Sequence, residues 1–477
     1  MRHRLRNYTQ LPSTDNQEDQ DDWADIEFGA ANLGDARLTS RLVALARRLA
    51  STPDCSFPRS LDAAELKAAY RFFDNDQVDT DGVLAPHIDQ TLRRMTQVPV
   101  VLAVQDTTEF NLTHLGATEG LGYGTGNQSR GFMLHSLLAV TPEGLPLGVL
   151  GMKTWVRHDA DLGRRRQRSK RDFNDKESVK WVEGLNHLAA LKARCPDTRM
   201  VGVGDRESDV YEVFVAARPA GVDWLIRAAW DRRTAHQERY LWDTVTASPP
   251  LGEIELELPA HRNMARRTAC LTLRCTQVSL IAPPRPSTKG TGRARLVPVN
   301  VFAIHALETG TSEGIEPLEW MLLSSVPTLT LDDALERLEW YARRWTIESW
   351  HRVLKSGCRI EARQFGNLER FVRATALFAV ISWRIMYATL LGRADPDLSC
   401  EVLLQPDEWR ALYCRANRTA KPPAATPSLG EVVLWIAKLG GYLNRKHDHP
   451  PGPTVMWRGF LVLHEITEMY RIFSQDG

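Results

Sequence analysis

The chain has 477 residues, which is long enough for two to four domains, each with its own core. Its 43% hydrophobic and 25% charged residues are typical of a globular protein and exclude a disordered or fibrous one. The formal net charge is only +1, because 60 Lys and Arg residues are offset by 59 Asp and Glu residues. This balance excludes a uniformly basic nucleic-acid-binding protein, so any DNA-binding surface has to arise from separated charges.

Charge is separated along the chain. Acidic residues gather near the start, and basic residues form one dense run farther on. Taken alone, such a basic run is more often a solvated loop than a binding site. The acidic group is Asp15, Glu18, Asp19, Asp21, Asp22 and Asp25, and the basic run is Arg164, Arg165, Arg166, Arg168, Lys170 and Arg171.

The sequence has no segment typical of a secreted or membrane protein. Arg2, Arg4 and Arg6 are followed by polar residues rather than by an apolar stretch. The longest apolar run, residues 376–381, is far shorter than the roughly 20 residues of a membrane span. The seven cysteines are scattered without C-x-x-C spacing, which predicts neither a disulfide framework nor a zinc site. We therefore expect a cytoplasmic protein, associated with the nucleoid when it binds DNA.

The first predicted domain, residues 1–96, is helical. A polar leader extends to about residue 22. Apolar residues then recur at the three- and four-residue intervals of amphipathic helices. One helix carries Leu38, Leu42, Leu45 and Leu49, and a second carries Leu66, Ala69, Tyr70 and Phe73.

Short apolar runs typical of buried strands follow, and they alternate with helical patterns. This order predicts a mixed α/β domain over residues 97–235. The expected strands are residues 100–105, ending at Asp106, then 131–140, 146–156, 200–204, ending at Asp205, and 222–228; the expected helices are residues 178–193 and 209–217.

A β-rich insertion is predicted over residues 236–328, because alternating and β-branched runs replace the helical pattern. Helical periodicity returns at residues 331–357 and dominates to the C-terminus. We therefore assign residues 329–375 to the second part of the α/β domain and residues 376–477 to a helical C-terminal domain. The strands expected in the insertion are residues 253–258, 269–274, 278–281, 297–304 and 319–324.

The most informative segment is W-Y-A-R-R-W-T-I-E-S-W-H-R-V-L-K, residues 340–355. Five polar residues in it have the spacing that places side chains on one face of an α-helix, so a carboxylate is surrounded by cations and a phenol. A solvated helix with ion pairs explains this spacing equally well. The five residues are Tyr341, Arg344, Glu348, Arg352 and Lys355, and the positions expected to be buried are Trp340, Trp345, Ile347 and Leu354.

Two predicted strands end in aspartate, at Asp106 and Asp205. Each Asp alone is more often a turn or helix-cap residue. Functional groups of α/β sheets lie at strand ends, however, and two adjacent carboxylates repel each other unless a cation lies between them. Together with Glu348 they form an oxygen ligand set that suits two Mg²⁺ or Mn²⁺ ions, which serve phosphoryl transfer.

These residues resemble the catalytic core of the DDE transposases, in the branch with the signature Y-x2-R-x3-E-x6-K that includes the transposon Five type. Tyr341, Arg344, Glu348 and Lys355 match every position of that signature. D-R-E-S-D at residues 205–209 resembles the D-R-E-A-D segment of the family, and D-T-T at residues 106–108 matches its D-T-T. Shorter similarities near both ends extend the resemblance over nearly the whole chain.

The resemblance implies a ribonuclease-H-like fold with a β insertion between the second Asp and the Glu. It also implies that Asp106, Asp205 and Glu348 are catalytic and metal-binding. The positions that match DNA contacts of the family are Arg41, Arg71, Arg227, Trp320, Tyr341, Arg344, Lys355 and Arg352, the last replacing a Lys.

Several of these positions have an ordinary structural explanation. Trp320 lies in an apolar run typical of a core, but the resemblance favours a tryptophan that stacks on a flipped base. Arg41 and Arg71 could be solvated helix residues. Ser51 and Thr52 replace a basic and an aromatic contact residue of the family, so the terminal DNA sequence that this chain recognises does not follow from the resemblance.

The implied function is cut-and-paste transposition of double-stranded DNA. The expected steps are nicking at the transposon end, attack of the freed 3′ hydroxyl on the opposite strand to form a hairpin, reopening, and transfer into target DNA. One alternative is a ribonuclease-H-like nuclease that cuts without joining, against which the end-binding and C-terminal domains weigh. Another is a DNA-binding regulator or inactive relative, which would be expected to lack one of the three acids.

The apolar and aromatic C-terminal segment either packs onto the catalytic domain or forms a dimer interface. The resemblance implies a homodimer that pairs two DNA ends, in which each catalytic core acts on the end bound by the other subunit. We therefore expect a monomer or weak dimer without DNA and a dimer in the paired-end complex.

Overall fold

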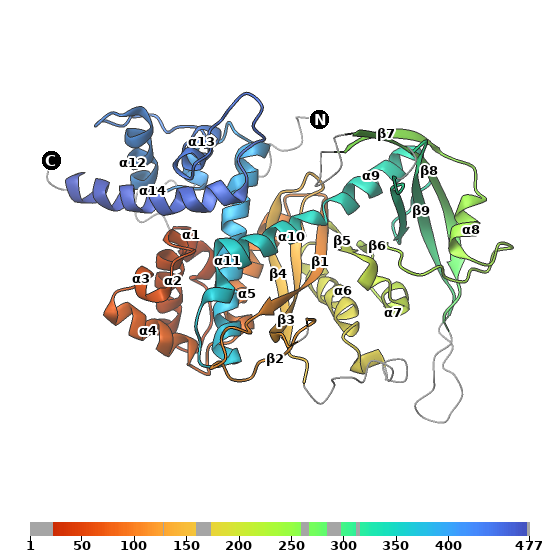
Figure 1. Ribbon diagram of the computed structural model, residues 1–477, viewed down its shortest axis with the longest axis horizontal. Coiled ribbons are helices and arrows are strands. Elements are labelled where there is room, and N and C mark those ends of the chain that lie inside the picture. Colours follow the sequence, from red (N-terminus) through yellow and green to blue (C-terminus); the bar gives the residue numbers. More distant parts are fainter. Residues whose placement is uncertain are drawn as a thin grey trace. The chain divides into compact units, whose positions relative to one another are not determined.

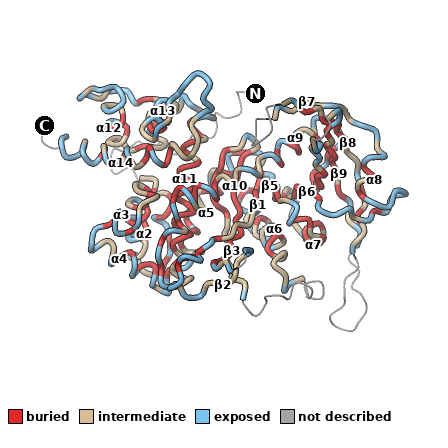
Figure 2. The backbone as a smooth tube through the Cα atoms, viewed as in Figure 1, coloured by how far each residue is buried: buried red, intermediate tan, exposed pale blue. Residues whose placement is uncertain are grey.

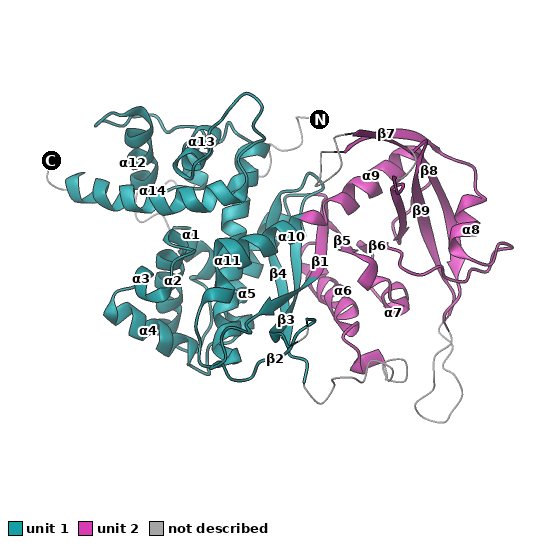
Figure 3. Ribbon diagram, in the orientation of Figure 1, with its two compact units in different colours: residues 1–98, 107–160, 346–477 teal, residues 99–106, 161–345 magenta. Residues whose placement is uncertain are grey.

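The computed structural model describes residues 22–126, 128–158, 173–258, 267–283, 297–311 and 315–474. Most of the acidic leader and the whole basic run at 164–171 lie outside these residues. The chain divides into two compact units (Figure 3). The first unit comprises Met1–Val98, Thr107–Ala160 and Thr346–Gly477, and the second comprises Pro99–Asp106 and Asp161–Trp345.

The first unit begins with five helices. Both helices predicted in this region are confirmed: the apolar stripe of the first predicted helix is buried at Leu42, Leu45 and Leu49, and the second begins at a capping box in which Asp62 accepts the Glu65 N–H at 2.8 Å. The helices are α1 (Trp23–Phe28), α2 (Ala36–Ser51), α3 (Phe57–Ser60), α4 (Ala63–Phe73) and α5 (Thr80–Met95).

A buried cluster joins these helices to one another. Glu27 of α1 accepts hydrogen bonds from Arg94 Nη1 at 2.7 Å and from His87 Nδ1 at 2.5 Å, both on α5. The Val149 N–H donates to His87 Nε2 at 2.9 Å, so the ring proton of His87 is on Nδ1 and the imidazole is neutral. Burial lowers the pKa of His87 in agreement with this tautomer, and Arg94 supplies the positive charge that Glu27 faces.

The two strands predicted at residues 131–140 and 146–156 are present in the first unit and form a β-hairpin. Strands β3 (Arg130–Val140) and β4 (Pro146–Trp155) pair antiparallel, and the Thr141 N–H closes the turn on the Leu145 carbonyl at 2.9 Å. The short strand β2 (Gly122–Tyr123) pairs with β3.

Helix α11 (Leu368–Ala394) is the central helix of the first unit, and its backbone is buried along most of its length (Figure 2). It packs on α5 and β4, and Trp383 Nε1 donates to the Pro146 carbonyl at 2.8 Å. Among the described residues, α11 is the one helix whose length and apolar composition would suit a membrane span. Because 89% of its apolar window is buried inside the protein, α11 has the character of a core helix.

Three further helices complete the first unit: α12 (Pro406–Asn417), α13 (Leu429–Leu439) and α14 (Pro453–Ser474). The backbones of α13 and α14 approach closely at two glycines, Gly440 and Gly459. A Cβ on Gly459 would lie 1.9 Å from the Ile436 carbonyl oxygen, and one on Gly440 would lie 1.8 Å from that of Val455. The two glycines thus allow α14 to lie directly against α13.

The second unit is a mixed sheet with helices. Its strand order is β1-β5-β6-β10-β9-β8-β7; the first three strands are parallel, and the pairings from β6 onward are antiparallel. The strands are β1 (Val100–Asn111), which continues into the first unit after Asp106, β5 (Arg199–Gly204), β6 (Val222–Arg227), β7 (Gly252–Leu258), β8 (Arg267–Leu280), β9 (Val299–Thr309) and β10 (Glu319–Ser324).

The helices of the second unit include one that the sequence did not reveal, α8 (Leu241–Thr246), ahead of the β-rich strands. The two strands expected at residues 269–274 and 278–281 are one strand, β8. The prediction was wrong because polar Thr276 and Gln277 interrupt the apolar run, while their backbones still pair with β9. The other helices are α6 (Val179–Leu191), α7 (Tyr211–Val215) and α9 (Leu331–Ala342) (Figure 1).

Short helical turns connect these elements. In the second unit they are η3 (Phe173–Asp175), η4 (Lys192–Arg194) and η5 (Arg206–Ser208). In the first unit they are η6 (Val353–Gly357), η7 (Ile360–Ala362) and η8 (Cys400–Val402). Helix α10 (Trp345–Arg352) starts at the last residue of the second unit and continues into the first.

Candidate active site

Asp106 and Asp205 lie side by side at one edge of the sheet in the second unit. Strands β1 and β5 are parallel neighbours, and Val104 pairs with Val203. Each aspartate is two residues beyond this pair, so the two carboxylates are level in register. The predicted end of the first strand at Asp106 was wrong, because β1 continues to Asn111 through β-branched Thr107 and Thr108; only its pairing with β5 stops before Asp106.

The environment of Asp205 disfavours its charged form. Burial raises the pKa of Asp205, and the neighbouring charge of Asp106 raises it further. A hydrogen bond from the Glu207 N–H at 2.8 Å and the positive charge of Arg344 act in the opposite direction, but the pKa remains above its ordinary value. The two aspartates therefore repel each other in the absence of a cation.

The chemistry of this pair fits a divalent metal ion. The charge of Asp106 raises the pKa of Asp205, and a hard cation between the two carboxylates relieves this repulsion; carboxylate oxygens are suitable ligands for such a cation. Within the described part of the chain, no three His, Cys, Asp or Glu side chains form a group that could hold a metal ion. Asp106 and Asp205 thus provide a ligand pair, and the third predicted acid, Glu348, belongs to the first unit.

Four predicted DNA-binding residues lie in the second unit near this edge. Gly204 of β5 pairs with Ile226 of β6, which brings Arg227 level with Asp205. Arg227 and Arg344 both lower the pKa of Tyr341, although burial of the phenol raises it more. Trp320 is half-buried and meets the Tyr341 ring edge-on, with centroids 6.0 Å apart. The structure thus brings Arg227, Trp320, Tyr341 and Arg344 together.

A buried ion pair, missed in the sequence analysis, holds the loops at this edge. The Asp209 side chain is fully buried and accepts hydrogen bonds from Arg232 Nε at 2.7 Å and from the backbone N–H groups of Ala229 at 2.7 Å and Trp230 at 2.9 Å. Asp209 ends the D-R-E-S-D segment that begins at Asp205, and Ala229 follows Arg227 by two residues. The ion pair therefore ties the loop after β5 to the loop after β6.

Glu348 lies on α10, but the predicted continuous helix over residues 331–357 is interrupted. The Arg344 N–H bonds to the Tyr341 carbonyl, three residues back, at the break between α9 and α10, and η6 is a single π-helical turn. The five polar residues from Tyr341 to Lys355 therefore do not share one regular helical face. Trp340, Ile347 and Leu354 are buried as expected, whereas Trp345 is 64% exposed, so its predicted burial was wrong.

Two predicted DNA-binding cations, Arg352 and Lys355, follow Glu348 in the first unit. Arg352 is exposed. Lys355 donates a hydrogen bond to the Glu109 carbonyl, and its Nζ lies 3.5 Å from the Glu361 carboxylate. His351, three residues after Glu348, is buried with its Nε2 3.3 Å from Ser136 Oγ.

Arg41 and Arg71 are exposed on α2 and α4 of the first unit. Arg41 lines a hollow of about 270 Å³ whose wall includes Ala44, Ala64 and Ala68. Small side chains let another molecule approach the helix backbones closely. Both arginines are thus available for contact from solvent.

The mixed sheet, with two aspartates level just beyond the paired part of two parallel strands, defines a protein of the ribonuclease-H-like class that processes nucleic-acid strands. Comparison with models of known protein families gives three matches in chain order: Transposase DNA-binding at residues 20–78, Transposase DDE domain at residues 178–383, and Transposase Tn5 dimerisation domain at residues 380–475.

The chain belongs to the DDE transposases of the Tn5 type. It is therefore a metal-dependent enzyme that cleaves and transfers DNA strands, and it binds DNA and forms dimers. The family expected from the signature residues is confirmed.

Proposed function

We propose that the chain is a cut-and-paste transposase whose catalytic residues are Asp106, Asp205 and Glu348. The observation that carries this proposal is the register of β1 and β5, which places Asp106 and Asp205 level at the same sheet edge. Glu348 supplies the third carboxylate from α10, seven residues after Tyr341 in the family signature.

We infer that these three carboxylates hold Mg²⁺, in two sites, and that Mn²⁺ can replace it. When bound, such ions activate the attacking oxygen and stabilise the leaving oxygen of a phosphoryl transfer. The protein's own contribution is to place the DNA phosphate beside the acids. Arg227 and Arg344, which flank Tyr341, are suited to bind phosphate oxygens there.

The proposed reaction has four steps. Water first cleaves one strand at the transposon end and frees a 3′ hydroxyl. This hydroxyl attacks the opposite strand to form a hairpin, water reopens the hairpin, and the 3′ end finally attacks target DNA. A hairpin requires a strained turn in the DNA, and the half-exposed ring of Trp320 is suited to stack on a base flipped out of it.

The proposed domain roles follow the chain. Residues 1–96 bind the transposon end, with contacts from Arg41 and Arg71. Residues 97–235 and 329–375 form the catalytic core, in which Arg352 and Lys355 contact the DNA backbone, and residues 236–328 are the β-rich insertion. Residues 376–477 form the dimer, in which each core acts on the DNA end held by the other subunit. We place this activity in the cytoplasm, on nucleoid DNA.

The dimer surface that we propose is one face of α14. Val462, Met469 and Phe473 are exposed by 38%, 51% and 70%, and they recur at intervals of seven and four residues along the helix. This spacing gives an apolar stripe of the kind that pairs helices. It lies within the matched dimerisation region, so the occupant we propose is the same stripe of a second copy.

The test replaces each acid separately with Ala and measures cleavage of a DNA duplex that carries the inverted repeat flanking the gene. We expect each variant to lose cleavage and to retain end binding, because binding resides mainly in residues 1–96. Glu401→Gln, on an exposed turn, is the control. Mg²⁺-dependent cleavage retained by Glu348→Ala would show that the carboxylate assignment is wrong.

A further inference from the structure

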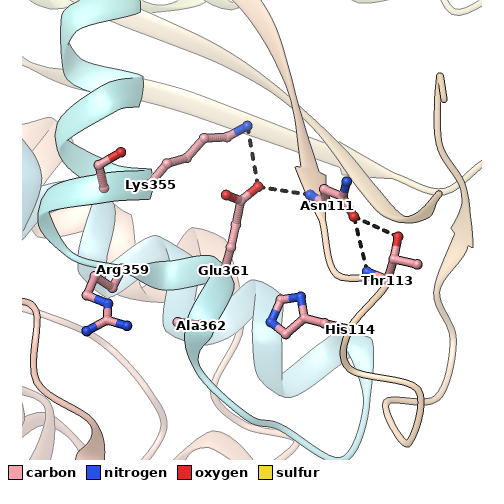
Figure 4. A pocket seen from close by; sticks show the side chains of 8 residues that line it. Asn111, Thr113, His114, Lys355, Arg359, Glu361 and Ala362 are labelled. Carbon is pink, nitrogen blue, oxygen red and sulfur yellow. Dashed lines mark hydrogen bonds and ion pairs between the residues drawn. The ribbon is translucent and has the colours of Figure 1, made fainter.

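A solvent-open hollow of about 740 Å³ lies in the first unit, just beyond the helix that carries Glu348 (Figure 4). It is formed where the end of β1 and the following loop meet the segment after α10. The side chains that matter to its chemistry are those of Asn111, Thr113, His114, Lys355, Arg359 and Glu361.

The charged residues of the lining include more cations than anions. Lys355 and Arg359 are positively charged, whereas Glu361 is the one carboxylate among the described residues that line the hollow. His114 is exposed and offers an imidazole, whereas the Thr113 hydroxyl donates to Asn111 Oδ1 at 2.7 Å. A small anion with several acceptor oxygens matches this set of donors.

Glu361 and Lys355 form a loose ion pair in the hollow. Glu361 Oε1 accepts the Asn111 N–H at 2.9 Å and lies 3.5 Å from Lys355 Nζ (Figure 4). The side chains of Lys355 and Glu361 are 24% and 29% exposed, so water and ligands can reach both. Because an ammonium group has three donors, Lys355 can keep its bond to the Glu109 carbonyl and exchange the carboxylate for another anion.

Arg359 is held at the rim by an unusual backbone conformation. Its φ of 47° and ψ of 41° lie in the left-handed region, which residues other than glycine adopt uncommonly. The Ala362 N–H bonds to the Arg359 carbonyl at 3.0 Å and starts η7 from this residue. The strained turn places the exposed Arg359 side chain at the border of the hollow, where it points away from Lys355 and Glu361 (Figure 4).

We propose that this hollow receives phosphate groups of the DNA backbone. Lys355 and Arg359 supply the charged donors, and the Glu361 carboxylate occupies Lys355 until the phosphate replaces it. This inference rests on the proposed function, and it adds Arg359 as a DNA contact and Glu361 as a competing anion, neither of which is part of the family signature. The Glu361 carboxylate makes the hollow selective, because an anion can bind Lys355 only if it binds strongly enough to displace this carboxylate.

The test compares Arg359→Ala and Glu361→Gln with wild type in binding to end DNA over a range of salt concentrations. Gln keeps the oxygen that accepts the Asn111 N–H, so only the charge is lost. Arg415→Ala and Glu401→Gln are matched controls at exposed positions of the first unit. Far-ultraviolet circular dichroism and thermal melting confirm that each variant is folded.

Loss of one phosphate contact in Arg359→Ala is expected to reduce the slope of log K against log salt by up to about 0.9. Glu361→Gln is expected to raise affinity by about two- to fivefold, the equivalent of an exposed ion pair. Phosphate-ethylation interference should show one modified position that weakens wild type but not Arg359→Ala. Inorganic phosphate added to wild type should compete only weakly, which distinguishes a DNA phosphodiester from a free-phosphate site.

Wild-type slopes and an unchanged ethylation pattern in both variants would overturn the inference. Strong competition by inorganic phosphate, with no change in DNA binding, would overturn it in favour of a free-anion site. Cleavage of end DNA by wild type tests the proposed function separately, because it does not depend on either substitution.

Discussion

Asp209 and Arg232 form a buried pair in which the guanidinium also donates from Nη2 to the Asp209 carbonyl at 2.7 Å. The side chains are 0% and 10% exposed. Since Asp209 also accepts two backbone N–H groups after β6, one carboxylate fixes the loop that starts at Asp205 and the loop that follows Arg227. The pair therefore holds Asp205 and Arg227 in place at the carboxyl edge of the sheet.

Asp209→Ala is expected to lower the free energy of unfolding by about 3–5 kcal/mol, because Arg232 is left buried without a counter-ion. The double variant Asp209→Ala/Arg232→Met should lose less stability than the sum of the two single changes. Urea unfolding followed by tryptophan fluorescence measures both quantities. If the double variant loses as much free energy of unfolding as the two single variants together, Asp209 and Arg232 do not stabilise each other.

We expect the stabilising contribution of Glu27 to be lost at acidic pH. Burial raises the pKa of Glu27, but Arg94 and His87 lower it more, to about 2, from an ordinary value of 4.5. Arg384 and Tyr387 of α11 also face this carboxyl group. Because the folded-state pKa is depressed, the contribution to stability is complete above about pH 4.5 and is lost as the pH falls toward 2. Its size is on the order of 3 kcal/mol.

The measurement compares the unfolding free energies of wild type and Glu27→Gln between pH 6 and pH 2.5. The advantage of wild type should shrink across the acidic part of this range, since other carboxylates affect both proteins equally. An advantage that stays constant with pH would contradict the charged state assigned to Glu27.

End binding should depend on the exposed arginines of the N-terminal helices. We expect the Arg41→Ala/Arg71→Ala double variant to bind end DNA more weakly and with a salt slope reduced by up to about 1.8, two phosphate contacts having been lost. Folding should be unaffected, because both side chains are exposed. Fluorescence anisotropy at several salt concentrations decides it, and equal slopes would rule out contacts by these residues.

Pairing of two DNA ends should require the apolar stripe of α14. Met469→Glu/Phe473→Glu is expected to preserve binding of a single end and to abolish the paired-end complex, because charges would face each other across the proposed dimer. Glu401→Gln, at an exposed position outside α14, is the control. Native gels and sedimentation with end DNA provide the measurement; a stable paired-end complex in the double variant would assign the stripe no role in the dimer.

Local patterns in the sequence predicted much of the fold. The spacing of Leu42, Leu45 and Leu49 identified α2, and the apolar run before Asp205 identified β5, because burial of one face sets these patterns. The strand before Asp106 was predicted too short, since the apolar run ends there while the extended backbone continues through β-branched Thr107 and Thr108 to Asn111.

Two features of the candidate site could not be read from spacing. The break at Arg344 and the π-helical turn of η6 change which side chains share a face, and they depend on packing in three dimensions. The buried ion pair joins Asp209 to Arg232, which lies 23 residues later. The D-R-E-S-D segment therefore indicated Asp209 but not its partner. Exposed Trp345 likewise follows an apolar pattern that a local reading assigns to the core.

The division of the first unit among three chain segments has a consequence for synthesis of the protein on the ribosome. Helices α1 to α5 emerge first, but the apolar faces of α5 are covered by α11, which is made about 270 residues later. At a translation rate of about 5–20 residues per second, the apolar faces of α5 stay uncovered for tens of seconds. The second unit, which ends at Trp345, can complete its sheet during this interval. A nascent chain is therefore expected to need protection at its N-terminal helices, and truncation before α11 should yield protein that aggregates through them.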